Sequence, residues 1–209
     1  MLFRSILDVG CGTGRELTEL SKRYLDCVGV DVTPSMVEYA RRMNPDLEIS
    51  VGDMRSVRLN RTFDAIYALG GSINFAVSNE ELEQTIRTYA AHAHEGTLLL
   101  LQPLNASDFF GKFNIPEVVS VPYNGSTATG TSTFELSTVS QLVERKRTWR
   151  IEGEDEEFTA SMTWRIIFPA ELSYFLKQNG FEVLDIFETP GTSAYSTTAM
   201  YFVARYEGR

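Results

Sequence analysis

Short apolar runs alternate along the first half of the chain with stretches whose apolar residues recur every three or four positions. The apolar runs are residues 6–9, 27–30, 47–51, 63–69 and 97–102. Runs of that length are typical of buried parallel strands, and the wider spacing is typical of amphipathic helices. Ser78 and Glu81 form a capping box at the start of one such helix, which we expect Gly96 to end. The alternation predicts a parallel sheet with helices on both faces.

The pattern changes after residue 104. Residues 124–133 contain only Gly, Ser, Thr, Ala and Asn, a composition typical of a flexible loop. From Phe158 to Phe168 every second residue is apolar, which predicts a half-buried antiparallel strand with residues 134–151 as its partner. We therefore expect an antiparallel layer, residues 105–168, inserted into a core made of residues 1–104 and 169–209.

The composition is that of an ordinary domain with an insertion, since 43% of the 209 residues are hydrophobic and 22% are charged. No apolar run approaches the roughly 18 residues of a membrane span, and no apolar segment typical of a signal peptide follows Met1. Two cysteines do not make a disulfide framework. We expect no membrane association and a cytoplasmic location.

The charge of the chain disfavours nucleic-acid partners. It has 19 basic and 28 acidic residues and a net charge of −9, whereas nucleic-acid binding rests on a basic surface. The basic cluster at residues 145–147 is surrounded by glutamates that offset its field. The two histidines, His92 and His94, would point to opposite sides of a helix, so we expect no metal site.

A glycine-rich loop carries the strongest chemical signal. The segment from Asp8 to Gly14 reads DVGCGTG and lies where the first strand turns into the first helix. Glycines at such a turn let the backbone approach a ligand closely. A dinucleotide fingerprint would need its last glycine at position 15, which is Arg15, so the motif weighs against a nicotinamide-dependent oxidoreductase.

Two aspartates follow the next two strands. Asp31 ends the second strand, where a carboxylate accepts hydrogen bonds from ribose hydroxyls. Asp53 follows the third strand between Gly52 and Met54, where it can accept from an adenine amino group. Together with the glycine loop, these residues predict a nucleoside-binding crevice at the carboxyl edge of the sheet.

The motifs DVGCGTG at 8–14, GVD at 29–31, GDM at 52–54 and FDAIYAL at 63–69 together resemble those of class I S-adenosylmethionine-dependent methyltransferases. The resemblance covers essentially the whole chain. It implies an α/β fold with a Rossmann-like seven-stranded sheet in the order 3-2-1-4-5-7-6, strand 7 antiparallel, and an antiparallel β layer inserted after strand 5. The insertion resembles that of small-molecule N-methyltransferases, namely the glycine, sarcosine and amino-sugar N,N-dimethyltransferases.

The resemblance also implies a cofactor, S-adenosylmethionine, and residues that bind it. These residues are Asp8, Gly10, Cys11, Gly12, Gly14, Asp31, Val32, Met36, Asp53, Met54, Ala68 and Leu69. Asp31 would hold the ribose, Asp53 and Met54 would bind the adenine edge, and the backbone of residues 68–70 would face the methionine ammonium group.

For methyl transfer, the protein must mainly position the acceptor in line with the methyl carbon and exclude water from the site. The candidates for the acceptor pocket are Ser72, Asn74, Gln102, Tyr123 and Trp164. An equally simple interpretation makes Asn74 a turn cap and Trp164 part of the core of the insertion. No residue stands out as a catalytic base.

The sequence thus predicts methyl transfer from S-adenosylmethionine to a small molecule, with an amine as the favoured acceptor. An O-methyltransferase and a non-catalytic cofactor-binding or scaffold protein are the alternatives. The acceptor's identity and the number of methyl groups stay open, and the inserted layer is where we expect a homodimer contact, if one forms. Relatives of this class carry one or two helices before the first strand, so we expect that N-terminal cover to be absent, with residues 1–5 as a truncated gene end.

Overall fold

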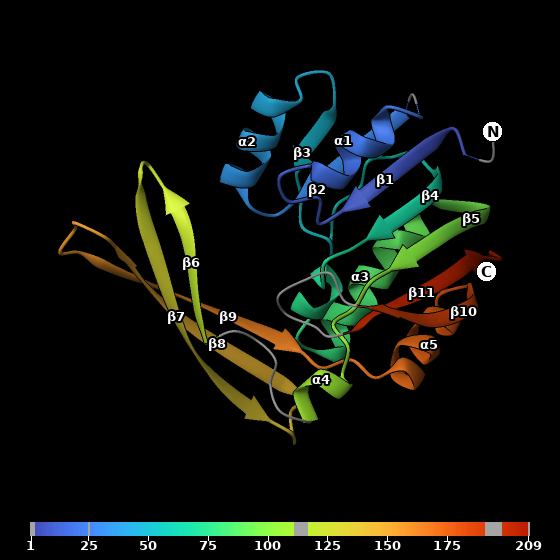
Figure 1. The fold of residues 1–209 in the computed structure, drawn as a ribbon. Coiled ribbons are helices and arrows are strands. Elements are labelled where there is room, and N and C mark those ends of the chain that lie inside the picture. Colours follow the sequence, from blue (N-terminus) through green and yellow to red (C-terminus); the bar gives the residue numbers. More distant parts are fainter. Residues whose placement is uncertain (1–2, 25, 111–116, 191–197, 209) are drawn as a thin grey trace.

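Two sheets organise the chain, a large mixed sheet and a smaller antiparallel sheet that projects from it (Figure 1). The computed structural model describes residues 3–24, 26–110, 117–190 and 198–208. The strands of the large sheet are β1 (Ser5–Val9), β2 (Asp26–Asp31), β3 (Glu48–Val51), β4 (Phe63–Ala68), β5 (Ala93–Leu101), β10 (Phe181–Pro190) and β11 (Thr198–Tyr206).

The order of the large sheet is β10-β11-β5-β4-β1-β2-β3. Strands β1 to β5 pair in parallel, whereas β11 runs antiparallel to both β5 and β10. When the strands of this sheet alone are numbered, the order is 3-2-1-4-5-7-6 with the seventh antiparallel, which confirms the predicted fold.

Helices cover both faces of the large sheet. They are α1 (Arg15–Ser21), α2 (Pro34–Met43), α3 (Asn79–Ala91) and α5 (Pro169–Gln178), with two short turns, η1 (Ser72–Phe75) and α4 (Ser107–Phe110). Successive residues of a strand point to opposite faces, so Ile6 packs with Leu17 and Val37 on the α1 and α2 side. Leu7 packs with Ile86 on the opposite side, in the cluster that α3 and α5 share. The carboxyl ends of the parallel strands stay uncovered by either layer.

The start of α3 follows the predicted capping box only in part. Ser78 Oγ accepts from the Glu81 N–H at 3.2 Å, as expected. The Glu81 carboxylate, however, accepts from the Val77 N–H at 2.8 Å.

Among the described residues, no helix combines the length and the apolar composition that a membrane span needs.

The end of α3 differs from the sequence expectation. The helix ends at Ala91, and Gly96 lies inside β5. His92 terminates the helix because its ring is only 1% exposed and bonds twice: Nε2 accepts from the Leu59 N–H at 2.9 Å, and Nδ1 donates to the Thr88 carbonyl at 2.8 Å. This buried side-chain contact, which involves a residue 33 positions away, decides where the helix stops.

The second sheet has the order β6-β7-β8-β9, all antiparallel. Its strands are β6 (Val118–Tyr123), β7 (Ser126–Ser137), β8 (Leu142–Ile151) and β9 (Glu157–Arg165). The predicted loop at residues 124–133 is therefore wrong, since most of it belongs to β7. The Thr, Ser and Gly residues of β7 pair through their backbone with β6 on one side and with β8 on the other. Composition alone does not reveal this context. The predicted partner, residues 134–151, contains the end of β7, a turn and the whole of β8.

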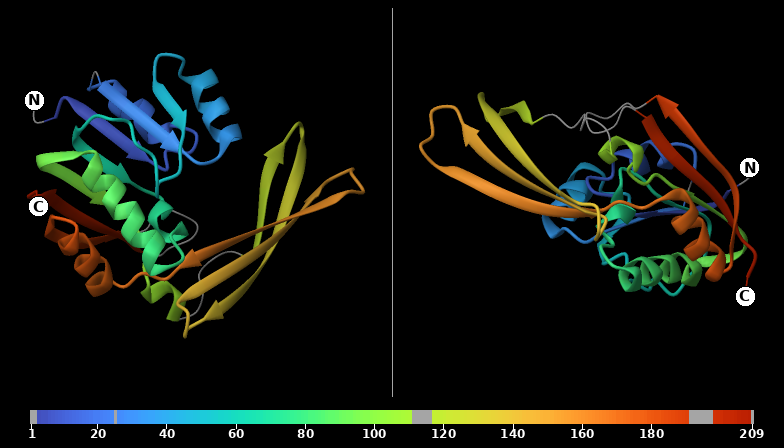
Figure 2. Two further views of the ribbon diagram at one scale, coloured as in Figure 1. Left: turned by 180° about the vertical axis from the view of Figure 1, so that it is seen from behind. Right: turned by 90° about the horizontal axis from the view of Figure 1, so that it is seen from below.

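The root of the second sheet packs against the core while its far end projects away (Figure 2). Val143, Trp164 and Ile166 form a buried cluster there with Ala106 and Phe109. Toward the tip, the same face carries apolar side chains that stay exposed. The insert is thus anchored at one end only within the described chain.

Candidate functional site

A crevice of about 1010 Å³ lies at the carboxyl edge of the large sheet. In open α/β sheets this edge is where ligands bind. Of the residues predicted from the sequence, those that line the crevice are Asp8, Gly10, Cys11, Gly12, Asp31, Val32, Met36, Asp53, Met54, Leu69, Ser72 and Gln102. They come from five consecutive strand ends, so the sheet topology brings together residues spread over nearly half of the chain.

The remaining cofactor candidates, Gly14 and Ala68, lie beneath the crevice surface. Gly14 begins α1 with φ of 76°, and a Cβ on it would lie 3.3 Å from Ile49 Cδ1. It permits close packing of α1 against α2 and β3. Ala68 is fully buried at the end of β4.

Three acceptor candidates also lie away from the lining of this crevice. Asn74 is fully buried, where its Nδ2 donates to the Arg165 carbonyl and its Oδ1 accepts from the Leu104 N–H, both at 2.8 Å. Trp164 is 8% exposed in the root cluster of the insert, and Tyr123 lies exposed on β6. Trp164 thus belongs to the core of the insert, whereas the side chain of Asn74 bonds two backbone groups that are remote in sequence and does not cap a turn.

The glycine loop is shaped by close contacts on one side and open space on the other. Gly10 has φ of 86°, and a Cβ there would lie 2.7 Å from Ser72 Cβ, so only glycine fits. Gly12 has φ of 54°, and the one atom near its added Cβ would be Met36 Sδ at 3.9 Å. The backbone at Gly12 is thus accessible to a ligand in the crevice.

Asp31 is the carboxylate that fixes this loop. Its Oδ2 accepts from the Gly12 N–H at 2.9 Å and its Oδ1 from the Thr33 N–H at 2.8 Å. A carboxylate has about four acceptor positions, so each oxygen keeps one for a further donor. Asp31 is therefore held in place and still able to accept two hydroxyl groups.

The crevice carries more negative than positive side chains. Four carboxylates and two guanidinium groups line it: Asp8, Glu16, Asp31, Asp53, Arg15 and Arg55. Arg15 pairs with Glu16 at 2.5 Å, and Arg55 pairs with Asp53 at 2.6 Å. Among the residues that the structure describes, no cation pairs with Asp8 or Asp31, and the surplus of carboxylates favours a cationic ligand.

Asp8 is a buried carboxyl group of the crevice. It is 3% exposed, and burial raises the pKa of its carboxyl group to about 8. Burial likewise raises the pKa of the neighbouring Tyr67 phenol. At neutral pH Asp8 is therefore largely uncharged.

Beyond the glycine loop, the ends of β5 and β11 form a second part of the crevice. Gln102 Oε1 accepts from the Gly70 N–H at 2.9 Å, and its Nε2 donates to Tyr201 Oη at 3.3 Å. The Tyr201 ring stacks on Phe187, with centroids 5.3 Å apart. Met162 of β9 lines the crevice from the insert.

The sequence interpretation missed Tyr201, Met162 and Asn105, which also line this second part. Tyr201 and Met162 belong to alternating apolar strands, which read as ordinary core. Only the pairing of β11 with β5 brings Tyr201 beside Gln102. The one signal in the sequence was the hydroxyl group that Tyr201 carries within the apolar stretch 199–204 of the last strand.

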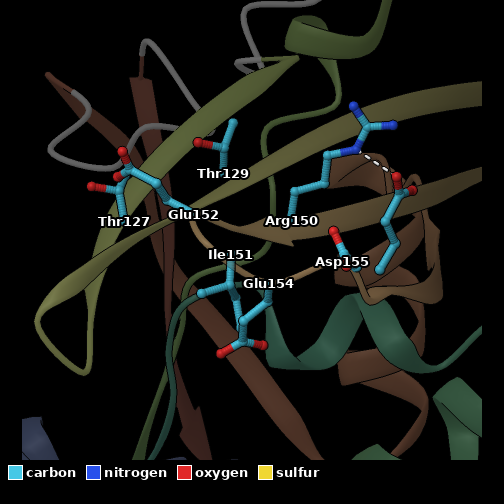
Figure 3. Close-up of a pocket in the computed structure, with 8 residues that line it drawn as sticks. Thr127, Thr129, Arg150, Ile151, Glu152, Glu154 and Asp155 are labelled. Atoms are coloured by element: carbon cyan, nitrogen blue, oxygen red, sulfur yellow. Dashed lines mark hydrogen bonds and ion pairs between the residues drawn. The ribbon is translucent and has the colours of Figure 1, made fainter.

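A smaller pocket of about 470 Å³ lies at the tip of the insert (Figure 3). Threonines of β7 line it together with acidic residues of the turn between β8 and β9, and Arg150 pairs with Glu157 at 2.6 Å. Within the described ranges, no group of three or more His, Cys, Asp or Glu side chains is arranged to hold a metal ion. The residues of this pocket form part of the polar outer end of the insert.

Comparison with known proteins agrees with this architecture. A family model described as a methyltransferase domain matches residues 6–96. The dTDP-3-amino-3,4,6-trideoxy-alpha-D-glucopyranose N,N-dimethyltransferase of Streptomyces venezuelae is 34% identical over 99 residues, which are 47% of this chain and 42% of that protein. The chain thus matches less than half of the length of this curated relative.

Solved structures extend the likeness to almost the whole chain. Streptomyces venezuelae DesVI superposes with a TM-score of 0.80 at 25% identity, over 98% of this chain and 84% of that one. The S-adenosylmethionine-bound CalS10, an amino pentose methyltransferase from Micromonospora echinaspora, gives a TM-score of 0.76 at 23% identity, over 97% and 84%.

The matched domain covers the strands from β1 into β5, whose ends build much of the crevice, and the likeness to DesVI extends over 98% of the chain. This agrees with the family that the four sequence motifs resemble. Residues 6–96 match a methyltransferase domain, and the fold of the chain is that of the class I S-adenosylmethionine-dependent methyltransferases.

Proposed function

We propose that this protein transfers a methyl group from S-adenosylmethionine to an amine nitrogen of a small molecule, with an amino sugar as the acceptor class. The observation that carries the proposal is the geometry of Asp31, which fixes the glycine loop and keeps two acceptor positions open to the crevice. The likeness to the Streptomyces venezuelae N,N-dimethyltransferase supports the choice of an amino sugar.

The residues present fit this cofactor. Asp31 matches the two ribose hydroxyls, the open backbone at Gly12 admits the methionine portion, and Asp53 with Met54 suits the adenine edge. S-adenosylmethionine supplies a methyl group on a positively charged sulfur, which is a good leaving group. Its cationic groups suit a crevice in which carboxylates outnumber guanidinium groups.

The acceptor would lie at the ends of β5 and β11. We assign its orientation to Gln102, whose amide is held by Gly70 and Tyr201, and to the Tyr201 hydroxyl. A neutral amine brings its own lone pair, so these groups position the nitrogen and accept or donate hydrogen bonds. Orientation of the two reacting groups accounts for much of the rate of such a transfer.

We assign two roles to the inserted layer, residues 105–168. Met162 brings β9 to the crevice, so the insert covers the acceptor and excludes water. We also propose that the exposed part of the same face forms a homodimer contact. Residues 1–104 and 169–209 form the methyltransferase core.

Isothermal titration with S-adenosylmethionine, followed by mass spectrometry of reactions with a panel of acceptors, tests the proposal. The panel contains nucleotide-linked amino sugars, simple primary amines, carboxylates and the matching hydroxyl sugars. We expect binding and the addition of 14 Da units to an amino sugar, a mass that follows from replacing N–H by N–CH₃. Folded protein that does not bind the cofactor contradicts the proposal. Transfer only to hydroxyl groups makes the protein an O-methyltransferase, and binding without transfer to any acceptor favours a scaffold.

A further inference from the structure

Arg55 joins two carboxylates that come from different parts of the fold. Its Nε and Nη2 bind the Asp53 carboxylate at 2.9 Å and 2.6 Å, and its Nη1 binds Glu81 Oε1 at 2.5 Å. Asp53 follows β3, whereas Glu81 lies in the first turn of α3. Asp53 and Arg55 both line the crevice.

We infer that Arg55 is a positioning residue, which holds the Asp53 carboxylate in the orientation that accepts a hydrogen bond from the 6-amino group of adenine. The inference rests on the proposed function, since it concerns the base of the proposed cofactor. The inference predicts that Arg55 determines the selectivity of this chain for adenine. It also assigns a role to Glu81, which lies outside the crevice lining and holds Arg55 in place.

The first argument is a count of acceptor positions. The two oxygens of a carboxylate offer about four. Three donor hydrogens occupy them: the Arg55 backbone N–H on Oδ1 at 2.8 Å, Nη2 on Oδ2 at 2.6 Å, and the single Nε hydrogen, which is shared between Oδ1 at 2.9 Å and Oδ2 at 3.1 Å. One acceptor position is left. It suits a single N–H donor such as the 6-amino group, whereas the 6-oxo group of hypoxanthine would place an oxygen against the carboxylate.

The second argument is the rigidity of the clamp. A guanidinium group binds a carboxylate through a planar fork, so it fixes the orientation of the carboxylate as well as its position. Glu81 is itself held, because its Oε2 accepts from the Val77 N–H at 2.8 Å. The bond to Glu81 therefore fixes the Arg55 guanidinium group relative to the start of α3, and the guanidinium group in turn fixes the Asp53 carboxylate.

The third argument is charge. Hydrogen bonds from Arg55 lower the pKa of Asp53, so the carboxyl group stays ionised at neutral pH and acts only as an acceptor. An ionised acceptor discriminates between an amino and an oxo group, whereas a protonated carboxyl could bind either. This supports the geometric assignment.

The test separates base selectivity from general folding. S-adenosylhomocysteine and S-inosylhomocysteine, its 6-oxo analogue, are titrated into wild type, Arg55→Lys, Glu81→Gln and the control Arg58→Lys. The Arg55→Lys variant keeps the positive charge at this position but lacks the planar pair of N–H donors that binds both carboxylate oxygens. Arg58 lies in the same loop but bonds Thr88 Oγ1 and the Val57 carbonyl outside the crevice lining.

We expect wild type and Arg58→Lys to prefer the 6-amino ligand equally. Arg55→Lys should reduce that preference about tenfold or more, the range that one charge-assisted hydrogen bond represents. Glu81→Gln should reduce it less. In an Asp53→Asn background, Arg55→Lys should change the preference no further, because Arg55 acts through Asp53.

Two results overturn the inference alone: an unchanged preference in folded Arg55→Lys, and equal weakening of both ligands, which is what a purely structural ion pair would produce. Wild-type protein that binds neither ligand overturns the proposed function together with the inference. Thermal melts of each variant confirm that the titrated protein is folded.

Discussion

At the scale of single residues, the crevice shows how the same carboxyl group takes different properties from its surroundings. Asp31 accepts from two backbone N–H groups, and Asp53 accepts from the Arg55 guanidinium group, which lowers the pKa of Asp53. Asp8 is buried without a paired cation, and its pKa rises to about 8. All three residues were candidates for cofactor binding because each lies at the end of a strand. Their different hydrogen bonds and burial give them different properties in the folded protein.

The first residue-scale prediction concerns Asp31→Ala. If Asp31 accepts both ribose hydroxyls, the affinity for S-adenosylhomocysteine should fall by about 2–4 kcal/mol, since each charge-assisted bond contributes about 1.5–3 and the two are not additive. Isothermal titration measures it. Asp26→Asn is the control, because Asp26 lies at the other end of β2 and pairs with Arg61. An unchanged dissociation constant for Asp31→Ala would refute the assignment.

The second concerns the pH dependence of stability. Burial raises the pKa of Asp8 from its usual 3.8 to about 8 in the folded chain. Between these values the folded state binds more protons than the unfolded state, so the contribution of Asp8 to the free energy of unfolding falls as pH rises. Asp8→Asn removes this titration. From pH 5 to pH 8 the variant should gain stability relative to wild type, by at most about 1.4 kcal/mol per pH unit.

Urea denaturation of both proteins at several pH values measures that difference. Asp185→Asn, at an exposed carboxyl group on β10, is the control and should run parallel to wild type. Parallel curves for Asp8→Asn and wild type across the same range would contradict the raised pKa.

At the scale of elements, the attachment of the insert depends on a residue outside it. Asn74 of η1 bonds the Leu104 N–H, where the chain leaves β5, and the Arg165 carbonyl, where β9 ends. One side chain therefore ties together the two connections between the sheets. The root cluster around Trp164 packs beside them.

Asn74→Ala should weaken this attachment. The substitution leaves the Leu104 N–H and the Arg165 carbonyl without their partner, at a cost of about 1–3 kcal/mol for each group that stays buried. Urea denaturation should show the loss in the free energy of unfolding. A change within about 0.5 kcal/mol, typical of surface substitutions, would mean that Asn74 does not hold the insert.

At the scale of the whole molecule, the insert presents a partly exposed apolar face. Val121, Tyr123 and Phe158 are 42%, 46% and 54% exposed. The strand registers place them on the face that also carries Met162 and Trp164, because directly paired residues share a face and alternate residues return to it. Exposed apolar surface of this kind marks an interaction site, which is the physical basis of the proposed homodimer.

Phe158→Glu tests this contact. A buried carboxylate without a partner is costly, so sedimentation equilibrium should show a shift of the wild-type dimer toward monomer. Thr159→Glu is the matched control, since Thr159 is the exposed next residue of β9 and points to the opposite face. A wild-type protein that is monomeric at micromolar concentration contradicts the proposed dimer.

The sequence by itself determined the succession of strands and helices in the core, the glycine loop and the position of Asp31 along the chain, and the sheet order followed from the family resemblance. Each depends on neighbouring residues: apolar periodicity sets a strand or helix, and the positive φ of Gly10 is a local backbone requirement. The four motifs then placed these elements in one known topology.

The tertiary structure alone decided the part of the crevice around Tyr201, the strand β7 and the attachment of the insert. Gln102 meets Tyr201 across 99 positions, and Asn74 meets Arg165 across 91. β7 forms because strands on both sides pair with its backbone, although its composition is that of a loop. Side-chain partners and strand pairings that are remote in sequence leave no local pattern, so the part of the crevice around the glycine loop was predictable, whereas the contact of Gln102 with Tyr201 was not.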